Sequence, residues 1–340
     1  MIPTVYLTKD RLETILARIL NVRAAVIGDV CLDAYWTADM RISQLSRETP
    51  HHNLPVIEER YSLGGAGNVM NNMRALGAHV VPVTALGRDW RGMIVEELMR
   101  DIDLSMDCTA IMDQRVTPCY VKPYRAGYGD VRYEDPRIDF ENRAPLTPNQ
   151  EDIMIAAVRR AAESADVIAV SDQLGCGVIS PRVRDAIIAA AAAGKTVIVD
   201  SRDRIMQYPN CIVKPNELES ARAVCLQPEC VTPDAYLPVA QALSDKTGRS
   251  VIITLGGGGA LCFCDGRAMH APAQRVQPPI DIVGAGDTFL SACALAMGAG
   301  ANLFDAVAFG NLASAVTIQK IGTTGVASPD EIRKQFGGNA

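Results

Sequence analysis

Apolar residues follow two different spacings along the chain, and these spacings predict a set of helices and a set of strands. Helical spacing runs through residues 12–20, 153–162, 182–193, 289–297 and 306–318. Shorter apolar runs of strand length occupy residues 24–28, 167–170, 196–199, 211–213, 251–255 and 261–263. Strands and helices that alternate in this way are typical of a parallel sheet with helices on both faces. We therefore expect an α/β fold with a mostly parallel central sheet.

Two regions lack the helical spacing. Residues 34–61 and 106–141 consist of short, mixed strand-like pieces, and the second contains an alternating stretch at 117–124 and a turn at 126–130. We expect both regions to leave the main body and to form a small β lid together. Because no internal repeat, low-complexity segment or linker interrupts the chain, we predict one domain over residues 1–340 with these two lid segments inserted in it.

The charge and the cysteines narrow the class of protein. The 340 residues carry a net charge of −6 without a basic block, which argues against a nucleic-acid-binding protein and leaves small molecules as the expected partners. The ten cysteines form no C-x-x-C pair and the four histidines have no ligand spacing, so we expect neither a metal cluster nor a disulfide framework. Reduced thiols are typical of the cytoplasm. The apolar runs are too short to cross a bilayer and residues 1–10 are polar, so we expect a soluble protein without a signal peptide or a membrane partner.

A glycine-rich turn leads into the apolar run at 289–297. It reads Asp281-Ile282-Val283-Gly284-Ala285-Gly286-Asp287. A turn of this kind at the start of a helix leaves backbone N–H groups unpaired and favours a bound anion. Asp287 can be explained as an acidic helix cap, but a carboxylate beside a phosphate site also suits phosphoryl transfer, where a base must meet a hydroxyl next to a charged phosphate. Its place at a helix start predicts a low pKa and therefore a weak base.

Other polar residues follow predicted strands or begin predicted helices. Asp33 comes soon after the first strand, where a loop cap is the simpler interpretation. Asn216 and Glu219 lie one helical turn apart, which fits a capping pair as well as it fits a ligand site. The four glycines at 256–259 lack the Lys-Ser/Thr pair of a P-loop, so a hairpin turn explains them.

Three separated motifs together resemble the ribokinase/PfkB family of sugar kinases. The family's C-terminal signature D-x-x-G-A-G-D matches residues 281–287, its G-G-x-x-N signature matches residues 64–68, and its N-x-x-E motif matches residues 216–219. The motifs occur in the family's order, and the resemblance extends over residues 22–329. It implies a ribokinase-like three-layer αβα sandwich with a small β lid, ATP and Mg²⁺ as cofactors, a monovalent cation near Asp281, and a homodimer formed through the lid.

The resemblance also implies roles for individual residues. It makes Asp287 the catalytic base and assigns the anion hole to Gly284, Ala285 and Gly286. It assigns the sugar to Asp33, Gly64, Gly65, Asn68 and Asp172, and we add Lys122 of the lid as a further substrate-binding candidate. Asn216 and Glu219 would act on Mg²⁺ and the nucleotide phosphates, in part through water. Thr254, Gly256 and Asn311 would lie at the nucleotide.

Within the family, residues 28–36, 41–43, 48–50 and 55–56 resemble the D-glycero-β-D-manno-heptose 7-phosphate kinase type, the kinase half of the enzyme of ADP-heptose synthesis. The chain departs from that type after Ser171-Asp172, where the type's Lys-Gly is absent, and at Asp200-Ser201-Arg202, where Asp-Pro-Lys is expected. The sequence contains no H-x-G-H motif of the adenylyltransferase half, so we expect the kinase half alone.

The identity of the substrate stays open at this point. A phosphorylated sugar needs a positive contact, which Lys122, Arg125 and Arg132 of the lid could supply, although such residues are more often solvated surface charges. The alternatives are a kinase of another sugar or a nucleoside, and a catalytically silent sugar-binding regulator with the same fold.

Overall fold

The computed structural model describes residues 2–337, in which nine strands form one main sheet. In spatial order these strands are β14 (Arg267–Ala271), β13 (Ala260–Cys264), β12 (Val251–Thr254), β11 (Ile212–Val213), β10 (Thr196–Ser201), β9 (Val167–Asp172), β1 (Arg23–Gly28), β4 (His79–Gly87) and β5 (Thr109–Met112). All neighbours from β12 to β5 pair parallel, while β13 pairs antiparallel with both β12 and β14. The mostly parallel central sheet is therefore confirmed.

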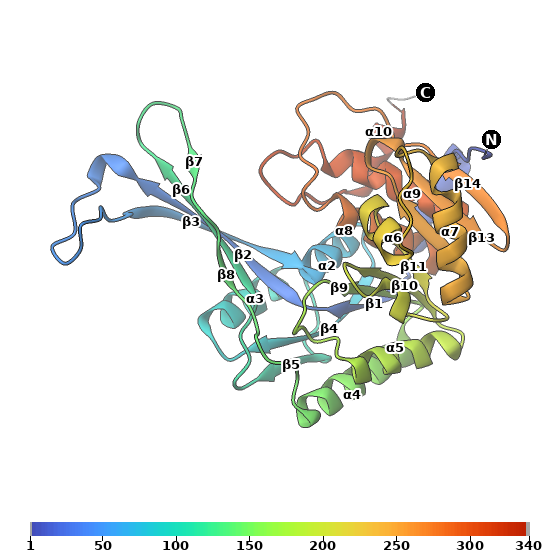
Figure 1. Ribbon diagram of the computed structural model, residues 1–340, viewed down its shortest axis with the longest axis horizontal. Coiled ribbons are helices and arrows are strands. Elements are labelled where there is room, and N and C mark those ends of the chain that lie inside the picture. The colour runs from blue at the N-terminus through green and yellow to red at the C-terminus, as the bar shows by residue number, and fades with distance from the viewer. Residues whose placement is uncertain (1, 338–340) are drawn as a thin grey trace.

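Helices cover both faces of this sheet, because alternate strand residues point to opposite sides. In β1, Ala24 and Val26 belong to one apolar core, and Ala25 and Ile27 belong to the other. The first core is closed by α1 (Lys9–Ile19), α2 (Ala66–Ala75), α3 (Trp90–Asp101), α8 (Ala285–Gly298), α9 (Leu303–Thr317) and α10 (Pro329–Gly337). The second is closed by α4 (Pro148–Ser164), α5 (Pro181–Ala192), α6 (Glu217–Ala223) and α7 (Pro233–Thr247). The result is a three-layer αβα sandwich (Figure 1).

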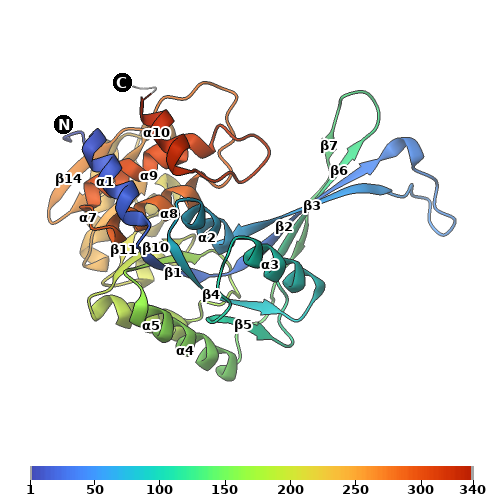
Figure 2. The same cartoon turned by 180° about the vertical axis from the view of Figure 1, so that it is seen from behind.

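A second sheet projects from one side of this body (Figures 1 and 2). Its strands are β3 (Val56–Gly65), β2 (Val30–Asp39), β6 (Cys119–Ala126) and β7 (Tyr133–Glu134), with β8 (Ile138–Phe140) also paired to β6. We call it the small sheet. β2 follows β1 after a single residue, and β3 leads directly into α2. The small sheet is thus connected to the body at the carboxyl end of β1, where ligands of open α/β sheets bind.

The boundaries of the two predicted lid segments need correction. Residues 109–112 form β5, which pairs with β4 at the edge of the main sheet, so the second segment of the small sheet begins at Cys119 and not at residue 106. The first segment is longer than predicted, because pairing between β2 and β3 begins at Val30 and ends at Gly65. Apolar alternation alone does not tell which sheet a short strand joins.

The sequence pattern also missed several elements of the body. It did not single out α7, which contains Pro238 inside the helix, nor β4 and α3. The predicted helix at 289–297 is confirmed as part of α8, whose residues from Thr288 to Ala296 are all buried. α8 packs closely on α9, since a Cβ at Gly310 would lie 3.0 Å from the ring of Phe289. No helix within residues 2–337 is both long and apolar enough to span a membrane.

Candidate active site

The start of α8 lies against α2, and side chains near the start of α2 hold it in place. The Nδ2 of Asn68 donates a hydrogen bond to Oδ2 of Asp287 at 3.1 Å. One turn further along, the hydroxyl of Thr288 bonds Oδ1 of Asn72 at 3.1 Å, and the hydroxyl of Ser291 donates to the carbonyl of Val69 at 3.0 Å. Two of the three sequence motifs, at residues 64–68 and 281–287, therefore meet in space.

The turn before α8 has the geometry of an anion site. Gly284 has φ 79°, a left-handed conformation that glycine adopts without strain. The amide of Ala285 donates to the carbonyl of Ile282, but the amides of Gly286 and Asp287 have no acceptor within residues 2–337. A Cβ added at Gly286 would meet no atom within 4 Å, so the space in front of these amides is open. Unpaired amides at a helix start favour a phosphate oxygen.

Asp281 shapes the loop that carries this turn. Its two carboxylate oxygens accept hydrogen bonds from the amides of Val283 at 3.0 Å and Gly322 at 2.9 Å. The side chain therefore joins the turn before α8 to the loop that follows α9.

The electrostatic surroundings of Asp287 differ from the sequence-based expectation. Burial, followed by the negative charges of Asp200 and Asp33, raises the pKa of Asp287 to about 7. The hydrogen bond from Asn68 and the charge of Lys214 act in the opposite direction but do not outweigh burial. The prediction of a low pKa was wrong because it considered the helix start and not the desolvation of the carboxylate by the packed helices.

A buried ion pair that sequence reasoning missed lies close enough to act on Asp287. The Nζ of Lys214 is 3.0 Å from Oδ2 of Asp200, and the two residues are 2% and 7% exposed. Burial lowers the pKa of the Lys214 ammonium group, but the negative charge of Asp200 raises it by more. The pKa of Lys214 is therefore raised. The sequence contained a signal for this pair, since each residue directly follows the apolar run of a parallel strand.

The sugar-side candidates lie at the root of the small sheet. Asp33 is a residue of β2, which excludes the loop-cap interpretation, and it lies opposite Ser62 of β3 and Tyr120 of β6. The Nζ of Lys122 contacts Oδ1 of Asp33 at 3.2 Å. Gly64 makes room for this carboxylate, because a Cβ there would lie 2.9 Å from Oδ2 of Asp33.

Gly65 directly precedes α2 with φ 58°, a conformation in which an L side chain is strained. A Cβ at this position would also come within 2.6 Å of the carbonyl oxygen of Asp29. The glycine therefore permits the close turn that brings Asn68 to Asp287.

The structure does not bring Asp172 to this site as an available carboxylate. The side chain is 2% exposed and forms an ion pair with Arg204. Its oxygens also accept hydrogen bonds from the hydroxyls of Ser201 at 2.9 Å and Tyr208 at 2.7 Å. This network fixes the carboxyl ends of β9 and β10, and the sequence pattern could not show that the acid was already satisfied.

The nucleotide-side candidates meet at the ends of β11 and β12. Asn216 and Glu219 form a capping box, each side chain accepting a hydrogen bond from the other's backbone amide. Asn216 also pairs with Thr254 in an isolated bridge, and Gly256 begins the turn that follows. Burial raises the pKa of Glu219. The capping interpretation is confirmed, and the bridge places the backbone of Asn216 next to that of Thr254.

Asn311 has a structural contact of its own. It is buried in α9, and its Nδ2 donates to the carbonyl of Ala271 at 2.8 Å. Its amide thus ties α9 to the end of β14 instead of standing open to a ligand.

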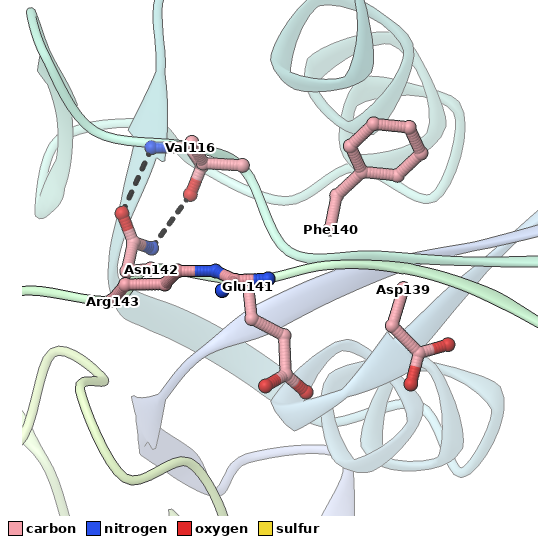
Figure 3. A pocket seen from close by; sticks show the side chains of 6 residues that line it. All are labelled: Val116, Asp139, Phe140, Glu141, Asn142 and Arg143. Atoms are coloured by element: carbon pink, nitrogen blue, oxygen red, sulfur yellow. Dashed lines mark hydrogen bonds between the residues drawn. The ribbon is translucent and has the colours of Figure 1, made fainter.

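A cavity of about 460 Å³ lies where the small sheet returns to the body (Figure 3). Asn142 closes one side of it through two hydrogen bonds with the backbone of Val116, at 2.9 and 2.8 Å. The carboxylates of Asp139 and Glu141 point to the same side, and Phe140 points away. Glu141 accepts a hydrogen bond from the hydroxyl of Tyr120, the residue opposite Asp33. Of the carboxylates at this root, Asp33 is paired with Lys122 and Asp139 with Arg137.

Residues 23–331 match the family model described as pfkB family carbohydrate kinase. Among curated proteins, the bifunctional protein HldE of Caulobacter vibrioides is 33% identical over 318 residues, and that of Geobacter metallireducens is 31% identical over 340 residues. These alignments cover 90% and 97% of this chain but only 62% and 66% of the relatives. The chain thus spans less than two thirds of the length of these relatives.

Solved structures agree on the fold. Phosphofructokinase-2 from Escherichia coli in complex with potassium has a TM-score of 0.73 at 21% identity, covering 93% of this chain and 98% of that one. Ribokinase from Arabidopsis thaliana complexed with ribose and ATP has a TM-score of 0.68 at 20% identity, with the same coverages. The ribokinase-like fold is confirmed. With the match of the family model over residues 23–331, it follows that the chain belongs to the pfkB family of carbohydrate kinases, which use ATP to phosphorylate sugars.

Proposed function

We propose that this kinase phosphorylates a sugar that already carries a phosphate, of the heptose 7-phosphate type, at a hydroxyl held between Asp33 and Asp287. The observation that carries the assignment of the base is the placement of the Asp287 carboxylate, bonded to Asn68, beside the unpaired amides of Gly286 and Asp287. The substrate class rests on the heptose-kinase-like stretches at 28–36, 41–43 and 48–50 and on the similarity to HldE proteins.

In the proposed reaction, Asp287 accepts the proton of the sugar hydroxyl while the hydroxyl oxygen attacks the terminal phosphorus of ATP. The bond from that phosphorus to the bridging oxygen breaks, and ADP leaves. The amides of Gly286 and Asp287 stabilise the charge on the transferred group. A carboxyl group with a pKa of about 7 is well matched to accept a proton near neutral pH.

The residues present fit a hydrated Mg²⁺. Asn216 and Glu219 offer one amide oxygen and one carboxylate, a donor set that suits an ion held mainly by phosphates and water. Glu219, with its partly buried carboxylate, and Asn216 would hold such an ion through water. When bound, Mg²⁺ offsets the charge of the nucleotide phosphates.

We also propose that a monovalent cation binds near Asp281. The support is that Asp281 connects the anion-site turn with the loop at Gly322, so a cation there would stiffen the turn. Replacing potassium by choline should then lower the rate of sugar phosphorylation, and an unchanged rate would remove this cation from the account.

The small sheet would serve as a lid and as a dimer contact. Apolar side chains on it are open to solvent, with Ile57 60% and Tyr133 63% exposed, and Val56 and Ile138 lie on the same sheet. Covering these side chains with a second copy of the chain would remove apolar area from water. A closed lid would also exclude water from the transferred phosphoryl group.

The substrate class is tested by ADP formation from Mg-ATP with heptose 7-phosphate, fructose phosphates, ribose and nucleosides. We expect selective turnover of D-glycero-D-manno-heptose 7-phosphate. Turnover of an unphosphorylated sugar alone would support the kinase activity and refute the proposed substrate class. Nucleotide binding without turnover of any member would favour a silent sugar-binding regulator.

Asp287→Asn tests the base. Because the amide cannot accept the proton, kcat should fall by roughly 10²–10⁴-fold, while the affinity for ATP measured by calorimetry stays close to that of the wild type. Asp265→Asn is the matched control, since Asp265 lies in an exposed turn with φ 49°, which asparagine tolerates. Retained activity in Asp287→Asn would assign the base to another group.

Sedimentation velocity tests the dimer. The mass obtained for the wild type should be twice the 36.5 kDa of one chain. For Ile57→Glu the mass should fall to that of the monomer, because the dimer contact would bury a charge. Ile153→Glu on α4, where the side chain is 50% exposed, should leave the dimer intact. A wild type that remains monomeric at all concentrations would refute the dimer.

A further inference from the structure

The small sheet carries arginines of two kinds. Arg41, Arg125 and Arg137 each form an ion pair with an aspartate close in sequence. Arg47, Arg60 and Arg132 have no carboxylate within ion-pair distance in the described part of the chain. All three are exposed; Arg47 lies in the loop between β2 and β3, and Arg60 and Arg132 lie over tyrosine rings.

Arg60 lies on the face of the small sheet that also carries Asp33. Residues two apart on a strand share a face, so Tyr35 lies on the same side of β2 as Asp33, about 7 Å further from the body. Arg60 of β3 and Lys122 of β6 are the residues opposite Tyr35 in the two neighbouring strands. The guanidinium carbon of Arg60 is 3.9 Å and the Nζ of Lys122 is 4.5 Å from the centre of the Tyr35 ring. Two cations therefore flank one tyrosine.

The charge of Lys122 is matched, but that of Arg60 is not. Lys122 bonds the carboxylate of Asp33 and, at 3.1 Å, the hydroxyl of Tyr35. Arg60 donates one hydrogen bond, from Nη2 to the carbonyl of Gly322 at 3.2 Å. Because a guanidinium group has about five N–H donors, most of the donors of Arg60 have no acceptor within residues 2–337.

The position of Arg60 is fixed relative to the anion site at α8. The carbonyl that Arg60 contacts belongs to Gly322, whose amide is bonded to Asp281. Asp281 in turn accepts the amide of Val283 just before the turn at Gly284. A chain of three hydrogen bonds thus connects the guanidinium group of Arg60 to the loop where phosphoryl transfer is proposed.

Charged groups lie in successive rows along this face of the small sheet. Asp33 and the Glu141 carboxylate bonded to Tyr120 lie at the root, where Arg137, paired with Asp139, lies 4.5 Å from the centre of the Tyr120 ring. The cations Arg60 and Lys122 come in the next row. Beyond them, Arg132 lies 4.1 Å from the centre of the Tyr124 ring and donates to the hydroxyl of Thr37 at 2.6 Å. Carboxylates suit sugar hydroxyls, and cations suit a phosphate.

We propose that Arg60, together with Lys122, forms the subsite for the phosphate that the sugar already carries, at the end of the substrate opposite the hydroxyl near Asp287. This inference rests on the proposed function and names the residues behind its substrate class. A guanidinium group binds phosphate through two parallel N–H bonds, which fits the donors that Arg60 has free.

Steady-state kinetics of Arg60→Gln test the subsite. The two substrates are D-glycero-D-manno-heptose 7-phosphate and the same heptose without its phosphate. We expect the KM for the phosphorylated sugar to rise roughly 10- to 100-fold, as expected for losing a hydrogen bond to a charged group. The kcat, the KM for ATP and the kcat/KM for the unphosphorylated heptose should change less than about twofold, since none of them depends on the sugar phosphate.

Two further variants make the result specific. Arg47→Gln removes the same charge from the same sheet at an exposed loop position, and it should leave every constant unchanged. Arg60→Lys keeps the charge without the paired donors, and its KM for the sugar phosphate should lie between those of the wild type and Arg60→Gln. Urea unfolding midpoints equal to that of the wild type would show that the variants are folded.

The possible failures are distinguishable. A wild type that phosphorylates only unphosphorylated sugars would refute the proposed substrate class and this subsite with it. A wild type that prefers the sugar phosphate, with an unchanged KM in Arg60→Gln, would overturn the subsite alone. An equal loss of activity toward both heptoses would also overturn it and would make Arg60 a structural link between the small sheet and Gly322.

Discussion

The site depends on a carboxylate that the fold partly covers without giving it a cationic partner of its own. Asp287 lies half-buried at the start of α8, where α2 packs beside it and Asn68 gives it one hydrogen bond. Lys214, the cation that lowers the pKa of Asp287, is already paired with Asp200. Burial therefore prevails over the favourable helix start and over Lys214, and the pKa of Asp287 rises to about 7. A carboxylate paired directly with a cation would be ionised but a weak base.

In the proposed function, the small sheet completes this site from the opposite side. Its root carries Asp33 and Glu141, which would meet the hydroxyls of a sugar. Its next row presents Arg60 and Lys122 around Tyr35. The hydrogen bond from Arg60 to Gly322 links this row to the body. In the proposed function, one end of the sugar is therefore held by cations while its hydroxyl at the other end meets the base.

Much of the fold could be predicted from the sequence because it follows from periodicity. The apolar strands and helices after residue 150 gave the parallel sheet, and the motifs at 64–68 and 281–287 identified two segments that do meet. The sequence could not show which polar groups are already satisfied. Asp172 is taken up by Arg204, Ser201 and Tyr208, and Asn311 by a backbone carbonyl. Nor could it show desolvation, which depends on neighbours far along the chain, and so it gave the wrong direction for the pKa of Asp287.

The most direct test of this account is an NMR titration of the Asp287 carboxyl group in protein labelled with ¹³C-aspartate, with Asp287→Asn used to assign the resonance. The account predicts a midpoint near pH 7 in the free enzyme, with the group protonated below that pH and ionised above it, as burial favours the neutral form. A midpoint close to 4, the ordinary range of an aspartate, would show that the helix start and Lys214 prevail over burial, and it would contradict the account.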